Sequence, residues 1–273
     1  MRLLLVALSL GAVLLAAPSV VAQPSTETAE VVQRGGQKFS VAVAPVDADA
    51  NLRNGPAVAA EVVEVLEGDL AFTGWFAPVA NRGFIEAIHK ADQEAGALQY
   101  SEWRALAQLL IKTKAEPAEG GRLTLTFSLV DPNQARELLA RRYTGNPELL
   151  RQLAHRFSDD VYEYFSRRKG ICSTRIAFVQ RTAKGSELCV MDYDGKGVLQ
   201  KTFDNSQVVA PAWSPDGRYI VFSSLRGGYW DVYRLNLASG QVDKLVAFPG
   251  INTQAEYSPD GQELVLILQN GQS

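Results

Sequence analysis

The sequence predicts an α+β N-terminal domain, a small mixed sheet with helices, followed by an all-β, incomplete β-propeller. The pentapeptide WSPDG at 213–217 recurs as YSPDG at 257–261, an offset of 44 residues from Trp213 to Tyr257. Propeller blades of about 40–50 residues, which bury their faces by stacking around a channel, produce this period. From residue 39 to residue 168 the pattern is instead α/β, with apolar residues at helical spacing between short strand-like runs. The change of pattern near residue 170 therefore separates two domains joined by a very short linker.

The repeated segment has the chemistry of a turn followed by a strand. In Ser-Pro-Asp-Gly the proline fixes φ and the glycine accepts a positive φ. The β-branched and aromatic run 219–222 follows it, and 231–237 is the next predicted strand. A fainter unit has strands at 175–180 and 188–193. Residues 171–273 are thus predicted as two blades and the start of a third.

These repeats are too few to close a ring, because propellers typically have four to eight blades. We expect either a fragment of a longer sequence or a ring that copies of this chain complete together. The run LVLIL at 264–268 is the most aggregation-prone window on such an open edge.

An α/β domain is predicted for residues 39–168. Its expected elements are strand 39–46, helices 56–70, 82–93 and 101–110, strand 122–130 and a hairpin partner at 135–143. A last helix follows, with Asn146 as its N-cap and Pro147 in its first turn. Cations at 167–169 and the glycine stop Gly170 are expected to end it.

The N-terminus has the pattern of a secretory signal peptide, predicted as residues 1–22 with cleavage near Ala22. A basic start precedes the apolar run 3–17, and small residues precede Gln23. A membrane anchor would need about 20 apolar residues, and Pro18 interrupts the run too early. Residues 23–38 are predicted as a flexible N-terminal segment of a soluble, exported protein.

Charge and cysteine content narrow the function further. The net charge of -3 and the pI near 5.6 provide no basic surface for nucleic acid, so no such partner is expected. Cys172 and Cys189 could form a disulfide in an oxidising compartment. In the predicted hairpin, however, they lie several residues apart along the strands, too far for a disulfide. Two thiols are therefore predicted.

We predict no catalytic residue, no cofactor and no metal site. The Gly-x-Ser-x-Gly, Gly-Lys-Ser/Thr and paired-histidine motifs of hydrolases, P-loops and zincins do not occur in the sequence. An imidazole can act as a general base, but His155 lies beside the apolar face of a helix, which favours a structural role. Asp192 and Asp194 resemble the start of a calcium loop, but no acid follows at its twelfth position, which favours a hairpin turn.

Six segments spread along the chain form a recognisable set. They are TGWFAP at 73–78, LVD at 129–131, AHRFSDDVYE at 154–163, TRIAFV at 174–179, MDYDG at 191–195 and PAWSPDG at 211–217. Together they cover nearly all of the chain after the signal peptide. In sequence and in order, these segments resemble the TolB family of the bacterial Tol-Pal cell-envelope system.

The resemblance implies a periplasmic, non-enzymatic scaffold with an α/β domain and a six-bladed propeller of TolB/WD40-like blades. Such a protein links inner-membrane Tol proteins to the outer-membrane-associated lipoprotein Pal. It keeps the outer membrane intact and draws it inward during cell division. In that family the mature N-terminal segment engages TolA and the channel mouth of the propeller receives Pal. The corresponding residues here are Glu30, Val31, Val32 and Gln33 for TolA, and Asn252, Thr253 and Gln254 for Pal.

Two other interpretations stay open at this point. Exported prolyl-oligopeptidase-like peptidases also carry propellers with Ser-Pro-Asp-Gly repeats, so the chain could be the propeller portion of such an enzyme without its catalytic domain. A gene that continues past Ser273 into more repeats would favour the TolB family, and one that continues into a Gly-x-Ser-x-Gly domain would favour the peptidase. A glycan-binding propeller is the third possibility.

Overall fold

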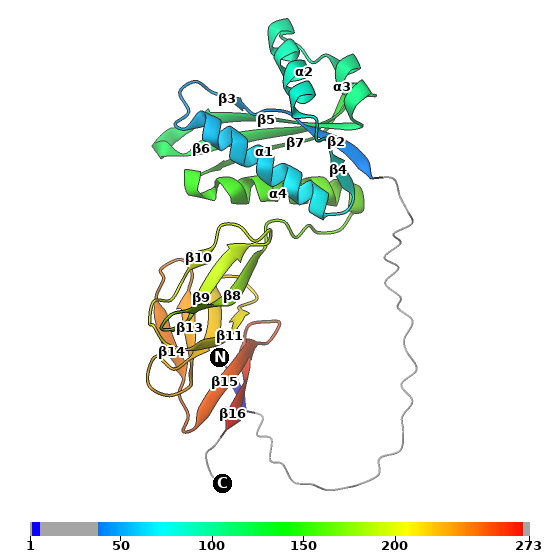
Figure 1. The fold of residues 1–273 in the computed structure, drawn as a ribbon. Helices are drawn as coiled ribbons and strands as arrows, with labels where there is room; N and C mark the ends of the chain where they lie inside the picture. The colour runs from blue at the N-terminus through cyan, green and yellow to red at the C-terminus, as the bar shows by residue number, and fades with distance from the viewer. Residues whose placement is uncertain (1, 6–37, 270–273) are drawn as a thin grey trace, which may run out of the picture. The chain divides into compact units, whose positions relative to one another are not determined.

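The computed structural model describes residues 2–5 and 38–269 (Figure 1). The chain divides into two compact units, Glu30–Thr174 and Arg175–Ser273, the second together with Met1–Ala29. The predicted cleavage near Ala22 lies outside the described residues, as do residues 23–37 of the predicted flexible segment. The bounds of the four segments predicted from the sequence, 1–22, 23–38, 39–168 and 171–273, therefore remain predictions.

A mixed sheet forms the centre of the N-terminal unit, with the strand order β4-β2-β5-β6-β7 and β3 beside β5. Parallel pairing joins β2 (Phe39–Val43) to β4 (Phe76–Pro78) and to β5 (Leu109–Pro117). Antiparallel pairing continues from β5 to β6 (Leu123–Asp131) and then to β7 (Arg136–Gly145). The two-residue strand β3 (Asp47–Ala48) runs parallel to the end of β5.

Four helices cover the two faces of this sheet. Figure 1 shows α1 (Gly55–Phe72) and α4 (Leu150–Ser166) lying together on one face, where the larger apolar core of the unit forms. The other face packs against α2 (Arg82–Ala95) and α3 (Tyr100–Leu106), around the buried Trp103. Two short 3-10 turns, η1 (Glu119–Gly121) and η2 (Pro147–Leu149), precede β6 and α4.

The predicted alternation in β6 is confirmed and explains how the sheet binds its helices. Leu123, Leu125, Phe127 and Leu129 are all buried on the face toward α1 and α4. The ring of Phe127 stacks on that of Phe157 from α4, with centroids 4.5 Å apart. Because successive side chains of a strand point to opposite faces, the residues between them form the other surface of the sheet.

One predicted element is wrong. Residues 101–110 were expected to be a single helix, but α3 ends at Leu106 and β5 begins at Leu109. Leu109, Ile111, Thr113 and Ala115 alternate inward along β5, and Lys112 and Lys114 alternate outward. The strand is central to the sheet, so its pairing with β2 and β6 overrides the helical spacing of the preceding residues.

Both ends of the last helix also differ from the prediction. Asn146 makes no side-chain cap; its carbonyl oxygen instead accepts the N–H of Leu149, 2.9 Å away, within η2. The C-cap is Arg167, which adopts a left-handed φ of 60°, whereas Gly170 lies three residues further on. Glycine is the usual residue at such a position, so the sequence did not indicate Arg167.

The C-terminal unit contains a four-stranded blade flanked by two three-stranded sheets. The blade orders β11 (Val208–Trp213), β12 (Tyr219–Ser224), β13 (Asp231–Asn236) and β14 (Val242–Val246) in sequence, all antiparallel. The preceding sheet consists of β8 (Arg175–Thr182), β9 (Gly185–Asp192) and β10 (Leu199–Gln200). The following sheet pairs β15 (Ile251–Tyr257) with β16 (Glu263–Gln269), and β1 (Arg2–Leu5) lies parallel to β16.

The two Ser-Pro-Asp-Gly turns have the same hydrogen bonds. Ser214 Oγ donates to Asp216 Oδ1 at 2.7 Å and accepts the N–H of Tyr219 at 2.9 Å. Ser258 Oγ makes the equivalent bonds to Asp260 at 2.6 Å and to the N–H of Glu263 at 2.9 Å. The repeat found in the sequence is thus a structural repeat, as expected for consecutive blades.

The fold class is confirmed: a mixed α/β domain comes first, and a β-rich region of propeller blades follows. In the described part of the chain, no helix is both long and apolar enough to cross a membrane. Cys172 and Cys189, which both lie among the described residues, are buried and form no disulfide, as the sequence predicted.

Candidate binding surfaces

The predicted Pal-binding residues lie at the start of β15, and they are not equally accessible. Asn252 is fully buried, and its amide fastens the chain that precedes the strand. Its Nδ2 donates to the carbonyl oxygens of Phe248 at 2.8 Å and Trp230 at 3.2 Å, and its Oδ1 accepts the N–H of Phe248. Asn252 therefore shapes this surface rather than presenting a side chain on it.

Gln254 is the exposed member of the predicted group, whereas Thr253 is half-buried. The backbone of Gln254 has a positive φ of 52°, and β15 is irregular between Thr253 and Glu256. Its N–H donates to Ser223 Oγ of the neighbouring blade at 3.2 Å. Ile251, at the beginning of the strand, is also exposed. The side chains available to a partner at this place are thus Ile251 and Gln254.

A polar hollow of about 690 Å³ lies along β8, β9 and β11. It includes the cationic Arg181, the hydroxyl of Ser186 and the amide of Gln207 among its lining residues. Gly185 at its rim has no room for a side chain, because a Cβ there would overlap the backbone of Ser206. The Ser186 hydroxyl is already bonded to the backbone of Val208, so the exposed side chains of Arg181 and Gln207 are the polar groups that the hollow offers to a partner.

Buried charges fix the strands around these surfaces. Glu187, 2% exposed, accepts from Thr202 Oγ1 at 2.5 Å and from the N–H of Asn205 at 2.8 Å. Lys244 Nζ donates to Asp231 at 2.8 Å, and this hydrogen bond raises the pKa of the lysine. A buried carboxylate is stable only when such donors surround it. These hydrogen bonds therefore tie β9 to the loop at Thr202 and Asn205, and β13 to β14.

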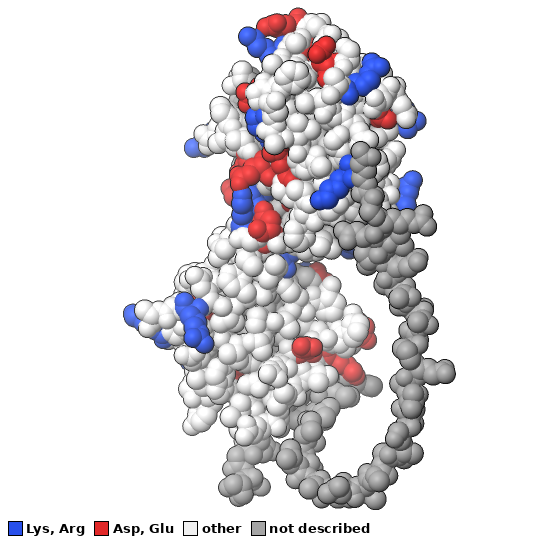
Figure 2. All heavy atoms as spheres, turned by 45° about the vertical axis from the view of Figure 1, so that its right-hand side comes forward, with Lys and Arg blue, Asp and Glu red and all other residues white. Residues whose placement is uncertain are grey.

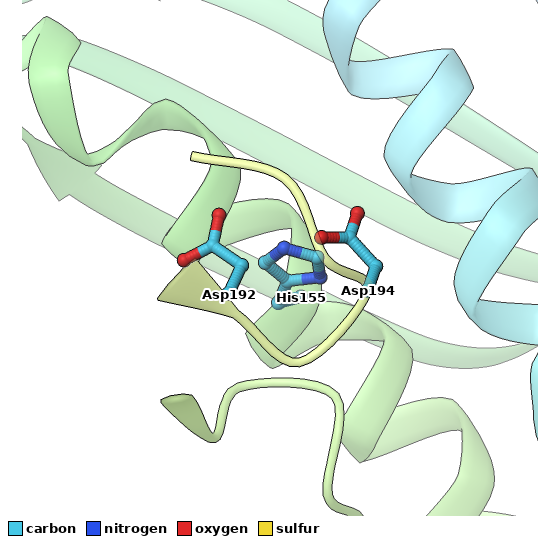
Figure 3. Close-up of side chains that lie close together, drawn as sticks. All are labelled: His155, Asp192 and Asp194. Carbon is cyan, nitrogen blue, oxygen red and sulfur yellow. The ribbon is translucent and has the colours of Figure 1, made fainter. Parts of the chain in front are cut away.

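His155 belongs to the N-terminal unit, where its Nδ1 lies 2.8 Å from Asp69 Oδ2. Figure 3 draws it with Asp192 and Asp194, which come from the end of β9 and the following turn in the other unit. The three groups belong to different units, and we assign them no shared site. Asp194 Oδ1 accepts the N–H of Lys196 at 3.0 Å, as in a hairpin turn.

Asp159 on α4 holds the chain that leaves the N-terminal unit. Its Oδ1 accepts the N–H of Cys172 at 2.6 Å, and its Oδ2 accepts the N–H of Ser173 at 2.9 Å. Gly170 passes so close that a Cβ at this position would overlap Asp159. The glycine and the aspartate together fix residues 170–173 against the helix.

The surface charge is mixed in sign. Figure 2 shows Lys and Arg side chains interspersed with Asp and Glu on the face that it draws. This distribution agrees with the small net charge of -3.

Family models match both units of the chain. Residues 27–138 match the TolB amino-terminal domain, and residues 162–273 match the TolB beta propeller domain. The chain belongs to the TolB family. Both TolB domains occur here in the order that the resemblance implied.

A curated relative and a solved structure agree with this assignment. The Tol-Pal system protein TolB of Francisella tularensis subsp. mediasiatica (strain FSC147) is 35% identical over 181 residues, covering 63% of this chain and 41% of the relative. The crystal structure of TolB from Acinetobacter baumannii superposes with a TM-score of 0.68 at 22% identity, covering 86% of this chain and 56% of that one. The latter likeness supports the fold alone. The chain thus spans about two fifths of the length of this curated TolB relative.

The residues predicted to engage TolA, Glu30, Val31, Val32 and Gln33, lie outside the described residues. Sequence reasoning did not identify the structural roles of Asp69, Glu187 and Asp159, which hold neighbouring segments together. A signal existed for Asp69, because it falls on the apolar stripe of α1, four residues after Val65. Glu187 and Asp159 lack such a signal, since their donors are backbone N–H groups or residues of neighbouring turns.

Proposed function

We propose that this chain is a periplasmic, non-enzymatic scaffold of the Tol-Pal system, which binds Pal and TolA. In this role it maintains outer-membrane integrity and invagination during cell division, and it contacts the outer membrane only through its partners. The observation that carries the proposal is the match of both TolB domain models, in family order, to one chain. A peptidase propeller would not be preceded by a TolB amino-terminal domain.

The propeller unit supplies the rigid surface that binding to Pal requires. Ile251 and Gln254 are exposed at the start of β15, while Asn252 locks the preceding loop and Ser223 holds the backbone of Gln254. A surface that is already ordered loses little conformational entropy on binding. We therefore assign Ile251 and Gln254 to the Pal contact.

The segment Glu30, Val31, Val32 and Gln33 is assigned to TolA. After removal of the signal peptide it would lie close to the new N-terminus, ahead of β2. A short segment that exchanges between contact with its own protein and contact with TolA would couple the two partners through a shift in population.

The test measures both partners on reciprocal variants of the protein that begins at Gln23. Deletion of residues 23–36 is expected to weaken TolA binding at least about tenfold and to change Pal binding less than about threefold. Ile251→Glu combined with Gln254→Lys is expected to do the opposite. Because each variant should keep its binding to one of the two partners, that retained binding shows that the variant is folded. Failure of the unmodified protein to bind either partner would refute the proposed function.

A further inference from the structure

The strand β7 has an open edge. It is the last strand in the order β4-β2-β5-β6-β7, and within the described residues it pairs with β6 alone. The pairing runs from Arg136 to Gly145, so ten residues present one row of backbone groups to β6 and leave the other row without a strand. The opposite edge, β4, has only three residues and ends in Pro78. Unpaired strand edges of this length are templates for another strand.

A hollow of about 290 Å³ lies beside this edge, between β7 and α4. Two of its lining residues, Leu139 and Arg141, are on β7 and are two positions apart, so they point to the same face of the sheet. The others come from α4 and its C-cap: Asp160, Glu163, Tyr164 and Arg167. A strand added to β7 would direct every second side chain toward this hollow, the arrangement by which strand-adding peptides are selected.

Arg141 and Arg167 are the cations that line the hollow, and Asp160 and Glu163 are its carboxylates. The preference for an acidic segment comes from the cations here that have no carboxylate partner. The Asp160 carboxylate already has hydrogen-bond donors within the protein, because it accepts from Arg141 Nε at 2.9 Å and from the hydroxyl of Tyr143. The guanidinium of Arg167 lies over the ring of Tyr164, with 5.8 Å between its Cζ and the ring centroid. Among the described residues, neither Arg167 nor Arg136 has an ion pair with a carboxylate. An incoming carboxylate would find these cations available.

We propose that β7 accepts an extended, acidic segment of a partner protein as an additional strand of the sheet. Backbone hydrogen bonds along β7 supply the affinity. The hollow between β7 and α4, with Arg167 at its end, supplies the preference for glutamate or aspartate at alternate positions. None of the residues assigned above to Pal or TolA takes part, so this binding site is additional to the proposed scaffold function.

The first test uses a nine-residue peptide of alternating Glu and Thr as the probe, with both ends capped, and nitrogen-15-labelled protein. We expect slowed hydrogen exchange at alternating amides of β7 when the peptide binds, because only every second N–H points away from β6. Protection of amides outside β7, or no binding of the peptide at millimolar concentration, would overturn the proposal.

The second test separates strand addition from charge attraction. N-methylation of the peptide amides that would face β7 removes strand pairing and leaves the charges of the peptide unchanged. N-methylation of the alternate amides, which would face away from β7, leaves strand pairing intact. We expect one methylated peptide to lose binding and the other to keep it, and a peptide with Lys in place of Glu to bind at least about tenfold more weakly. Equal binding of both methylated forms, or of the Lys peptide, would contradict strand addition.

The third test uses a matched pair of protein variants at the end of α4. Arg167→Ala is expected to weaken the Glu-Thr peptide about three- to tenfold, because Arg167 lines the hollow. Arg168→Ala removes the same charge from the next residue, which is exposed and does not line the hollow. Equal losses in the two variants would mean unspecific attraction to the cations at the helix end and would reject the assigned role of the hollow.

Discussion

His155 Nδ1 and Asp69 Oδ2 are 2.8 Å apart, and both side chains are 1% exposed. Asp69 is near the end of α1 and His155 is in α4, so the contact joins segments 86 residues apart in the sequence. Both helices cover the same face of the N-terminal sheet. The pair therefore fixes the two helices to each other at a point where water cannot replace either partner.

Removal of the His155 ring should destabilise the protein strongly. We expect His155→Ala to lower the free energy of unfolding by about 3 kcal/mol, since it leaves the Asp69 carboxylate buried without this donor. His155→Asn places an amide near the position of Nδ1 and should lose only about half as much. Urea unfolding followed by tryptophan fluorescence measures both, with the exposed Lys90→Ala as the control. A loss below about 1 kcal/mol in His155→Ala would contradict the importance of the pair.

Two glycine-to-alanine substitutions should have opposite signs. In Gly170→Ala the new Cβ overlaps Asp159 and displaces its bonds to Cys172 and Ser173, so we expect a loss of about 2 kcal/mol. In Gly68→Ala, inside α1, the new Cβ meets nothing within 4 Å, so we expect a gain of about 0.5–1 kcal/mol. Thermal unfolding of the two variants compares them directly. Equal shifts would exclude a steric role for Gly170.

The Asp216 carboxylate should titrate near pH 2. The hydroxyl of Ser214 and the N–H of Arg218 donate to it, and they lower the pKa of Asp216 to about 2. A lowered pKa in the folded state means that the turn's contribution to stability is present above about pH 4 and is lost as the pH falls toward 2. We expect Ser214→Ala to raise the pKa of Asp216 toward 3.8, measured by carbon-13 NMR of the carboxyl group.

Ser239→Ala provides the control for this titration, because Ser239 lies in another turn and bonds Gln241. The pKa of Asp216 should not change in that variant. Asp260, whose pKa is lowered mainly by Ser258, should respond to Ser258→Ala in the same direction as Asp216 responds to Ser214→Ala. A pKa of Asp216 that is unmoved by Ser214→Ala would refute the hydrogen bond as its cause.

Trp103→Phe should destabilise the second core of the N-terminal unit by about 2 kcal/mol. The indole Nε1 donates to the buried Asp92 Oδ2 at 2.7 Å, and phenylalanine leaves that oxygen without this donor. The second oxygen of Asp92 still accepts the N–H of Gln99 at 2.6 Å. Trp75→Phe, at a tryptophan that is 42% exposed, is the control and should cost less than about 1 kcal/mol. Urea unfolding that gives equal losses would contradict the prediction.

The sequence predicted the propeller repeat, but it did not predict the left-handed backbone conformation and the bulge in the first strand of each repeat. The offset of 44 residues that relates Trp213 to Tyr257 also relates Ala210 to Gln254, and both of the latter adopt a positive φ near 50° beside a bulge. Alanine and glutamine do not signal a left-handed conformation. Only the strand pairing of each blade reveals the bulge. Asn252 was predicted as a contact residue from the family resemblance of its loop. Its burial depends on Phe248 and Trp230, which a single sequence does not bring together with it.

In the N-terminal unit, strongly periodic helices were predictable and the central strand was not. The helix 56–70 is confirmed as α1 because its apolar residues face one core. Strand β5 was missed because Leu109, Leu110 and Ile111 are consecutive apolar residues, which suit a helix as well as a strand that is buried on both faces. Pairs such as Asp69 and His155 depend on the packing of helices, which local sequence patterns do not encode.

The hold of Asp159 on residues 172 and 173 determines how a mechanical load would enter the N-terminal unit. A pull along the chain beyond Thr174 would first meet the two hydrogen bonds to Asp159, which lies well inside α4 rather than at its last turn. Force would then act across the body of the helix instead of peeling it residue by residue from Ser166. A connection loaded in shear distributes force over several contacts at once.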